Sequence, residues 1–229
     1  MKKNVWFITG TDTNVGKTVV SNCILRIGIQ KGYKTVGYKP VSSSKTIDLN
    51  VKNKNEDIIL LKQYSNTKLP DNCLNPFRFK QEGPPHLLSI VYNQPIELDT
   101  MSEKLNLIKS KANWIVIEGA GGWYTPLTNT TTFADWVNRE KLSVILVVGI
   151  KLGCINHAIL TQEAITKTKV NYIGWIANHI YPYNQFSQQY INTLKMYLKS
   201  CLLGEVPYFK KKICTNKLYK MFNSFINIF

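Results

Sequence analysis

Short apolar runs, separated by segments with a helical pattern, set the organisation of the chain. Six runs rich in Val, Ile, Trp and Tyr are typical of β-strands, and they lie at Asn4–Thr9, Thr35–Tyr38, Trp114–Glu118, Ser143–Gly149, Tyr172–Ala177 and Leu202–Val206. The stretch Val144–Val148 contains no alternating polar residue, which indicates a strand covered on both faces.

Between these runs, apolar residues recur at the spacing of amphipathic helices. The clearest helix begins after Gly16, carries Val20, Ile24 and Ile27 on one face, and ends at Lys31-Gly32. Further helices are predicted at Asp57–Tyr64, Asp99–Ser110, Ile155–Thr166 and Ser187–Leu198. This alternation predicts an α/β fold with a mostly parallel central sheet and helices on both faces. Because no repeat or linker interrupts it, we expect a single domain over residues 1–229.

Composition and charge narrow the class of protein. With 229 residues, 44% of them apolar and 19% charged, the chain can bury a core and is neither disordered nor fibrous. The net charge of +15 invites a nucleic-acid function, but Arg occurs only at 26, 78 and 139, and the Lys residues are scattered. Arginine supplies the paired contacts to phosphate and guanine, so we expect no nucleic-acid partner.

Cysteine usage and hydropathy exclude two further classes. The five cysteines form no C-x-x-C pair, which disfavours a disulfide scaffold and a zinc site. The apolar run after Lys2-Lys3 is too short for a signal peptide, and no stretch approaches the ~18 apolar residues of a membrane span. We therefore expect a cytoplasmic protein without a membrane partner.

A glycine-containing loop with the sequence Gly10-Thr-Asp-Thr-Asn-Val-Gly-Lys-Thr18 joins the first strand to the first helix. Such a loop places backbone N–H groups and a helix N-terminus around phosphate oxygens, with Lys17 on the β/γ-phosphates and Thr18 on Mg²⁺. The common motif has its first glycine where this chain has Thr11. The position between a strand and a helix nevertheless predicts a nucleotide site.

Acidic residues that follow the strands are candidates for the metal site, because Mg²⁺ prefers oxygen ligands. Glu118 ends a buried strand and precedes Gly119-Ala-Gly-Gly122, where it is either a metal ligand or a charge at the strand end. Asp57 is either a ligand or the first-turn acid of its helix. Asp12, inside the phosphate loop, faces metal, substrate or solvent.

Two further segments lie at the predicted carboxyl edge of the sheet, where ligands bind in such folds. Lys39 follows the second strand and is either a solvated lysine or a cation that stabilises charge on a transferring phosphoryl group. The segment Gly153–Asn156 links a strand to a helix and should present free N–H groups from Gly153 to Asn156 as a second anion site, suited to a carboxylate. We interpret Cys154 as non-catalytic, because it has no obvious paired base.

Several of these segments together resemble the dethiobiotin synthetases, ATP-dependent enzymes of the late biotin pathway. The resemblance runs from about residue 4 to residue 208. It is carried in order by the stretches 9–18, 37–41 (Gly-Tyr-Lys-Pro-Val), 118–127 (Glu-Gly-Ala-Gly-Gly-Trp-Tyr-Thr-Pro-Leu), 133–137 (Phe-Ala-Asp-Trp-Val), 151–158 (Lys-Leu-Gly-Cys-Ile-Asn-His-Ala) and 174–178 (Gly-Trp-Ile-Ala-Asn).

The resemblance implies a P-loop NTPase-like three-layer fold and a homodimeric enzyme that uses ATP and Mg²⁺. It would close a ureido ring on 7,8-diaminononanoate with CO2 or bicarbonate, giving dethiobiotin, ADP and phosphate. One amine would be carbamated, the carbamate would take the γ-phosphoryl group, and the second amine would displace phosphate.

The same resemblance assigns roles to residues of this chain. Lys17 and Lys39 would be catalytic, and Thr18, Asp57 and Glu118 would hold Mg²⁺. Thr11, Lys39 and Ser43 would line the diamine and carbamate. Gly153, Cys154, Ile155 and Asn156 would bind the substrate carboxylate across the dimer interface. ATP would be contacted by Thr13, Asn14, Val15, Gly16, Lys17, Thr18, Asp57, Glu118, Gly119, Ala120 and Gly121, and at the adenine by Asn178, Val206, Pro207 and Tyr208.

The chain departs from the family pattern at two places. Asn14 stands where many members carry an acidic residue, and the basic segment 209–229 diverges, with Lys210–Lys212 where relatives offer an acidic contact to the nucleotide. Apolar and basic residues in this segment fit either a helix docked on the domain or a membrane-surface helix of a partitioning or division-site ATPase. The ATPase alternative is disfavoured, because partitioning and division-site ATPases use a second lysine early in the phosphate loop, where this chain has Asp12.

Overall fold

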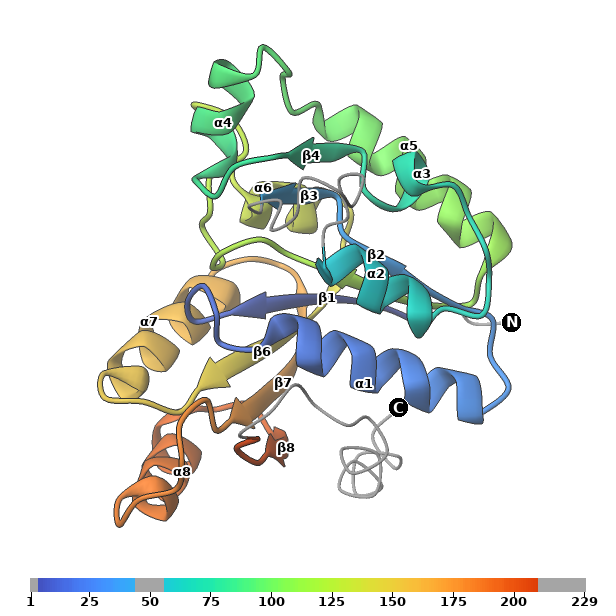
Figure 1. Ribbon diagram of the computed structural model, residues 1–229. Helices are drawn as coiled ribbons and strands as arrows, with labels where there is room; N and C mark the ends of the chain where they lie inside the picture. Colours follow the sequence, from blue (N-terminus) through green and yellow to red (C-terminus); the bar gives the residue numbers. More distant parts are fainter. Residues whose placement is uncertain (1–3, 44–55, 210–229) are drawn as a thin grey trace.

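A six-stranded parallel sheet forms the centre of the molecule (Figure 1). The computed structural model describes residues 4–43 and 56–209, with the backbone alone at residues 56 and 57. The strand order is β2-β5-β1-β6-β7-β8, and every neighbouring pair is parallel. The strands are β1 (Asn4–Gly10), β2 (Thr35–Tyr38), β5 (Trp114–Glu118), β6 (Ser143–Gly149), β7 (Asn171–Asn178) and β8 (Leu202–Val206).

Helices cover both faces of this sheet. On one face, α1 (Lys17–Gln30) and α2 (Glu56–Gln63) run beside one another (Figure 1) and supply one apolar cluster with the sheet. On the other face, a second cluster draws on α5 (Leu98–Lys111), α6 (Phe133–Arg139), α7 (Cys154–Thr166) and α8 (Ser187–Tyr197). The predicted fold class, a parallel sheet between two helical layers, is therefore confirmed. None of the described helices has the length and apolar character to cross a membrane.

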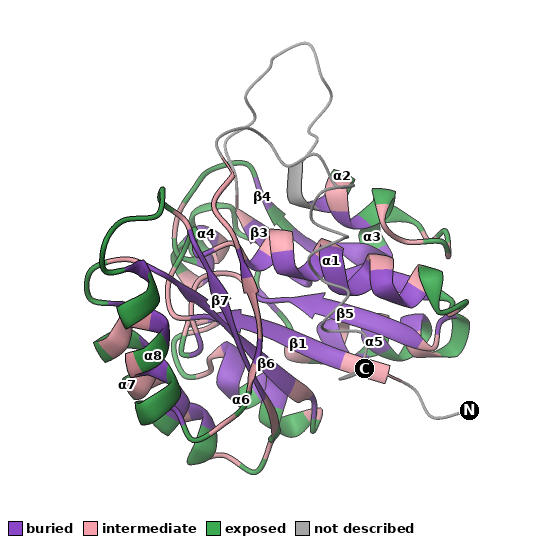
Figure 2. Ribbon diagram, turned by 90° about the horizontal axis from the view of Figure 1, so that it is seen from below, coloured by how far each residue is buried: buried purple, intermediate pink, exposed green. Residues whose placement is uncertain are grey.

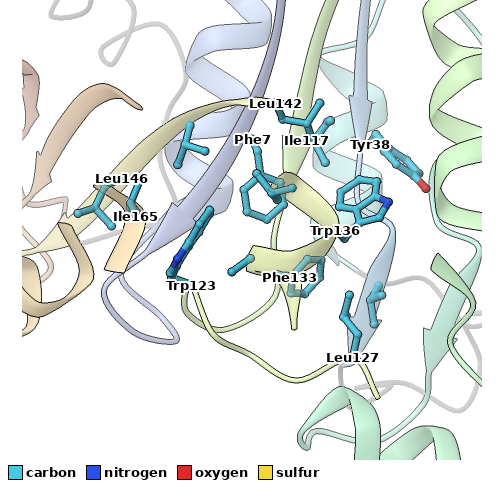
Figure 3. Packing of buried hydrophobic residues seen from close by; sticks show 14 of the residues in the cluster. Phe7, Tyr38, Ile117, Trp123, Leu127, Phe133, Trp136, Leu142, Leu146 and Ile165 are labelled. Atoms are coloured by element: carbon cyan, nitrogen blue, oxygen red, sulfur yellow. The ribbon is translucent and has the colours of Figure 1, made fainter. Parts of the chain in front are cut away.

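The alternation of side chains along β1 shows how the two clusters arise. Trp6 and Ile8 belong to the cluster under α1, whereas Phe7 points to the opposite face. There its ring lies 5.6 Å from Phe133 and 6.3 Å from Trp136, measured between ring centroids (Figure 3). Figure 2 shows the resulting burial along the central strands. Strands covered in this way carry apolar residues on both faces, which explains the unbroken runs in the sequence.

A small second layer lies beyond the β2 edge of the main sheet. The strands β3 (Val41–Ser43) and β4 (Phe77–Phe79) pair in parallel and contact α4 (Pro85–Val91), as Figure 1 shows. The short helix α3 (Asp71–Leu74) precedes β4. None of these four elements was predicted, because three-residue strands and one- or two-turn helices contain too few residues to show a period.

Predicted boundaries lie within one residue of the observed ones. The structure extends the predicted strands by one residue to Gly10, Asn171 and Asn178, and moves α7 forward to Cys154. The helix α6 was not predicted, although it has a strong start signal. Thr132 accepts the N–H of Asp135, and Asp135 in turn accepts the N–H of Thr132, in a capping box. The basic segment from residue 210 onward lies outside the described residues.

Candidate functional site

The phosphate loop between β1 and α1 is held in a conformation that only glycine fits well at residue 16. Gly16 has φ 94°, and a Cβ there would lie 2.0 Å from Nδ2 of Asn178. That amide donates a hydrogen bond of 2.8 Å to the carbonyl of Val15. The N–H of Thr11 donates to the carbonyl of Val147, 3.0 Å away. These hydrogen bonds attach the loop to β6 and β7. The N-terminal end of α1, which follows the loop, faces a cavity beside it.

Asp12 lies at the tip of the loop and makes three polar contacts. Its carbonyl accepts the ammonium of Lys17 at 2.9 Å, and its carboxylate accepts the N–H of Thr13 at 2.7 Å. The other carboxylate oxygen pairs with Nζ of Lys151, also at 2.7 Å. This hydrogen bond from Lys151 lowers the pKa of Asp12. The structure thus shows Asp12 in an ion pair with another loop, a contact that differs from the predicted alternatives of metal, substrate or solvent.

Three polar side chains meet at the carboxyl edge of β1 and β5. The parallel register pairs Ile8 with Glu118, so the carboxylate of Glu118 emerges beside the phosphate loop. One of its oxygens, Oε1, accepts the hydroxyl of Thr18 and the ammonium of Lys39, each at 2.8 Å. Lys39 is 6% exposed and Glu118 is 1% exposed. The surface roles considered for Lys39 and Glu118 are therefore wrong: the two residues form a buried ion pair.

The backbone of Lys39 is itself anchored by residues that precede β4. Its N–H donates to the carbonyl of Leu74 at 2.9 Å, and its carbonyl accepts Nδ2 of Asn75 at 2.7 Å. Asn75 also accepts the hydroxyl of Ser42 through Oδ1, at 2.9 Å. Asn75 is buried, and its role was not predicted because a single asparagine in a loop carries no sequence pattern.

A cavity of about 760 Å³ joins these groups. The predicted residues that line it are Thr13, Asn14, Gly16, Lys17, Thr18, Lys39, Ser43, Glu118, Gly119, Ala120 and Gly121. Its remaining walls were not predicted. They come from the loop before α4 and the start of that helix, through Glu82, Gly83, Pro84 and Pro85, and from the loop before α6, through Thr125 and Pro126. These residues follow β4, a strand too short to detect, or the glycine-rich segment after β5, so only the three-dimensional arrangement reveals them.

The donor groups beside Lys39 fit Mg²⁺. Oε2 of Glu118 is buried and has no hydrogen-bond partner among the described residues, although Oε1 of the same carboxylate has two. A buried anionic oxygen without a partner is costly and indicates a missing ligand. Together with the hydroxyl of Thr18 it offers two of the hard oxygen ligands that Mg²⁺ prefers. Asp57, the third predicted ligand, lies in the first turn of α2, and its side chain is outside the described part of the structure.

Other predicted residues do not line this cavity. Thr11 lines a neighbouring groove of about 360 Å³, with Trp123, Tyr124 and residues of α7. Val15 is fully buried. Asn178 and the stretch Val206, Pro207 and Tyr208 lie at the carboxyl ends of β7 and β8, and the N–H of His179 donates to the carbonyl of Val206 at 2.9 Å.

The turn Gly153–Asn156 begins α7, with Gly153 at φ 87°. The N–H of Cys154 donates to the carbonyl of Lys151, 3.0 Å away, so the expectation of a free N–H group at Cys154 is wrong. Burial raises the pKa of the Cys154 thiol, as expected for a non-catalytic cysteine.

Known proteins that are similar to this chain in sequence share one name. A family model described as an AAA domain matches residues 4–213. The chain is 51% identical over 210 residues to the ATP-dependent dethiobiotin synthetase BioD of Buchnera aphidicola from Acyrthosiphon pisum, strain APS, covering 90% of this chain and 92% of that protein. It is 44% identical over 205 residues to ATP-dependent dethiobiotin synthetase BioD 1 of Escherichia coli K12, covering 89% and 90%.

Solved structures with similar folds are more distant in sequence. A plasmid partition protein of Borrelia burgdorferi bound to AMPPNP has a TM-score of 0.60 at 16% identity, with coverage of 100% of this chain and 98% of that one. The septum site-determining protein MinD of Pyrococcus horikoshii with Mg-ADP has a TM-score of 0.58 at 14% identity, covering 100% and 94%. At this identity the likeness shows the P-loop NTPase fold alone.

The buried amide of Asn75 gives a testable consequence. Asn75→Ala leaves the carbonyl of Lys39 and the hydroxyl of Ser42 without their buried partner. We expect the free energy of unfolding to fall by about 1–3 kcal/mol, the cost of unsatisfied buried polar groups. Urea denaturation measures this, with the exposed Asn192→Ala on α8 as a matched control. Equal stability of the two variants would show that Asn75 does not anchor Lys39.

Proposed function

The chain belongs to the dethiobiotin synthetase family, and on this premise we propose how its residues carry out that reaction. The enzyme is an ATP- and Mg²⁺-dependent ligase that closes the ureido ring of dethiobiotin. The observation that supports the assignment of its site most directly is the group formed by Lys17, Thr18, Lys39 and Glu118. These side chains, from three segments of the chain, all line one cavity beside the phosphate loop.

The reaction joins 7,8-diaminononanoate and CO2 in three steps. One amine attacks CO2, loses a proton and becomes a carbamate. A carbamate oxygen attacks the γ-phosphorus of ATP, and the bond to ADP breaks. The second amine attacks the carbamoyl carbon and loses a proton as phosphate leaves, which closes the ring. The protein therefore has to hold two anions that repel one another, the carbamate and the triphosphate, in contact.

Lys17 and Lys39 supply the positive charge for this encounter. Lys17 begins α1 and is buried with its ammonium at the phosphate loop. Lys39 approaches from the β2 side, where Asn75 fixes its backbone. Ammonium groups held in a partly dry cavity stabilise charge that develops on phosphoryl oxygens, without reorganising at the moment of reaction. Residues 13–18 surround the phosphates, and the main-chain N–H groups from Asn14 onward are the donors, because the N–H of Thr13 donates to the carboxylate of Asp12.

Thr18 and Glu118, with Asp57, would hold Mg²⁺. The bound metal neutralises negative charge on the phosphate oxygens. Glu118 serves two purposes in this assignment, because Oε1 pairs with Lys39 while Oε2 accepts no hydrogen bond from the part of the chain that the structure describes. Gly119, Ala120 and Gly121 let the chain pass close to the phosphates at the wall of the cavity.

The organic substrate and the adenine occupy the two ends of the site in this proposal. Ser43 and Lys39 lie next to the diamine and carbamate in the main cavity, and Thr11 contacts the substrate from the neighbouring groove. In this proposal the protein is a cytoplasmic homodimer. The turn Gly153–Asn156 of one copy binds the carboxylate of the substrate that the other copy holds. Asn178 and Val206–Tyr208, at the ends of β7 and β8, contact adenine.

The components that phosphate release requires test the proposed reaction. We expect purified protein to release phosphate from ATP only when Mg²⁺, bicarbonate and 7,8-diaminononanoate are all present, because the carbamate is the phosphoryl acceptor. A coupled phosphate assay with each component omitted in turn measures this, and mass spectrometry identifies the product. Release that is equally fast without the diamine would contradict the proposed reaction.

Lys39 should act on the rate more than on nucleotide binding. For Lys39→Ala we expect kcat to fall by roughly 10²–10³-fold, because its contact strengthens as charge moves onto the phosphoryl oxygens. Affinity for ATP should change by only about threefold or less. Steady-state kinetics and equilibrium dialysis separate the two effects, with Lys195→Ala on the exposed side of α8 as the control. A loss confined to ATP affinity would assign Lys39 to binding instead.

A further inference from the structure

The ion pair between Asp12 and Lys151 joins two loops that carry different ligands. Asp12 is in the phosphate loop, and Lys151 lies in the connection from β6 to α7. The carboxylate oxygen and the ammonium nitrogen are 2.7 Å apart. The hydrogen bond between them lowers the pKa of Asp12 and raises that of Lys151, so both groups stay charged at neutral pH.

Stabilisation of the fold does not account for this pair. The side chain of Asp12 is 43% exposed and that of Lys151 is 27% exposed. Ion pairs this accessible to solvent contribute little to stability. The significance of the contact therefore lies in what it holds together.

On the side of the phosphate loop, Asp12 fixes the catalytic lysine. The same residue that pairs with Lys151 through its side chain accepts the ammonium of Lys17 through its carbonyl, at 2.9 Å. Its second carboxylate oxygen accepts the N–H of Thr13, which fixes the direction of the peptide between the two residues. A shift of Asp12 is thus a shift of the acceptor that holds Lys17.

On the other side, Lys151 belongs to the turn that starts α7. Its carbonyl accepts the N–H of Cys154 at 3.0 Å, and this hydrogen bond closes the turn around Gly153. Lys151 therefore holds the phosphate loop with its side chain and shapes the Gly153–Asn156 turn with its backbone. A displacement of either loop is transmitted to the other through one residue.

We propose that Lys151 is a positioning residue that couples the phosphate loop to the carboxylate-binding turn. The inference rests on the proposed function, in which the turn holds the carboxylate of the substrate in the neighbouring copy. Under that arrangement the ion pair links the nucleotide of one site to the organic substrate of the other. Nucleotide bound at the loop holds Asp12 in place, Lys151 then holds the turn, and the diamine binds more tightly.

Titration calorimetry tests this coupling directly. The affinity for 7,8-diaminononanoate is measured with and without AMPPNP and Mg²⁺, and the ratio of the two affinities is the coupling factor. In the unaltered protein we expect a factor of about five or more, the lower range for coupled sites. In Lys151→Met it should fall below about twofold, whereas affinity for AMPPNP alone changes by about threefold or less.

Two further variants separate positioning from general damage. Lys151→Arg preserves the charge and should keep most of the coupling, and Asp12→Asn should lose it from the other side of the pair. Lys169→Met, at an exposed position beyond the far end of α7, serves as the matched control. Thermal melting identifies any variant that does not fold.

Each outcome of the titration is decisive. Loss of coupling in Lys151→Met and Asp12→Asn, with retention in Lys151→Arg and Lys169→Met, supports the proposal. An unchanged factor in Lys151→Met, or a factor of one in the unaltered protein, overturns it. Failure of the proposed function has a different signature: the unaltered protein would then bind no diamine at all.

Discussion

The buried ion pair between Lys39 and Glu118 is the interaction on which the organisation of the site depends. Charges removed from water to this extent are tolerated only when they are paired, and removing one partner of such a pair costs about 3–5 kcal/mol. The pair forms because β2 and β5 are neighbours in the sheet and end at the same edge, so that Lys39 and Glu118 emerge side by side. Thr18 reaches the same carboxylate from the first turn of α1. The sheet thus brings Lys17, Glu118 and Lys39 into one cavity, where we propose that they bind phosphate, hold the metal and stabilise the phosphoryl transfer.

The loops around this centre are held by contacts from neighbouring strands. Asn178, at the end of β7, supports Val15 and fills the space that a side chain at residue 16 would need. The side-chain amide of Asn75 likewise holds the backbone of Lys39, by donating a hydrogen bond to its carbonyl. Together, the two amides hold the loop that leads into Lys17 and the backbone of Lys39. Electrostatic stabilisation of a transition state requires charged groups that are held in place in this way.

The main sheet, the phosphate loop and the ends of most elements could be predicted from the sequence, because long buried strands and amphipathic helices have clear periods. The contacts that complete the site could not. Asn75 and Glu82 lie in loops without a pattern, and the partner of Asp12 is 139 residues away. The high net charge proved uninformative about function, since among the described residues only two of the 29 basic side chains, Lys17 and Lys39, line the cavity. Family membership, rather than charge, decided between an enzyme and a nucleic-acid-binding protein.

Binding of Mn²⁺ in place of Mg²⁺, followed by electron paramagnetic resonance in the presence of AMPPNP, tests the central claim that Glu118 holds the metal while pairing with Lys39. Glu118→Gln keeps the shape of the side chain but removes its charge. We predict that affinity for the metal falls by at least about tenfold, since even residues that only orient metal ligands typically account for 10–100-fold. Glu103→Gln, exposed on α5, should bind as the unaltered protein does. Unchanged metal affinity in a folded Glu118→Gln protein would contradict the account.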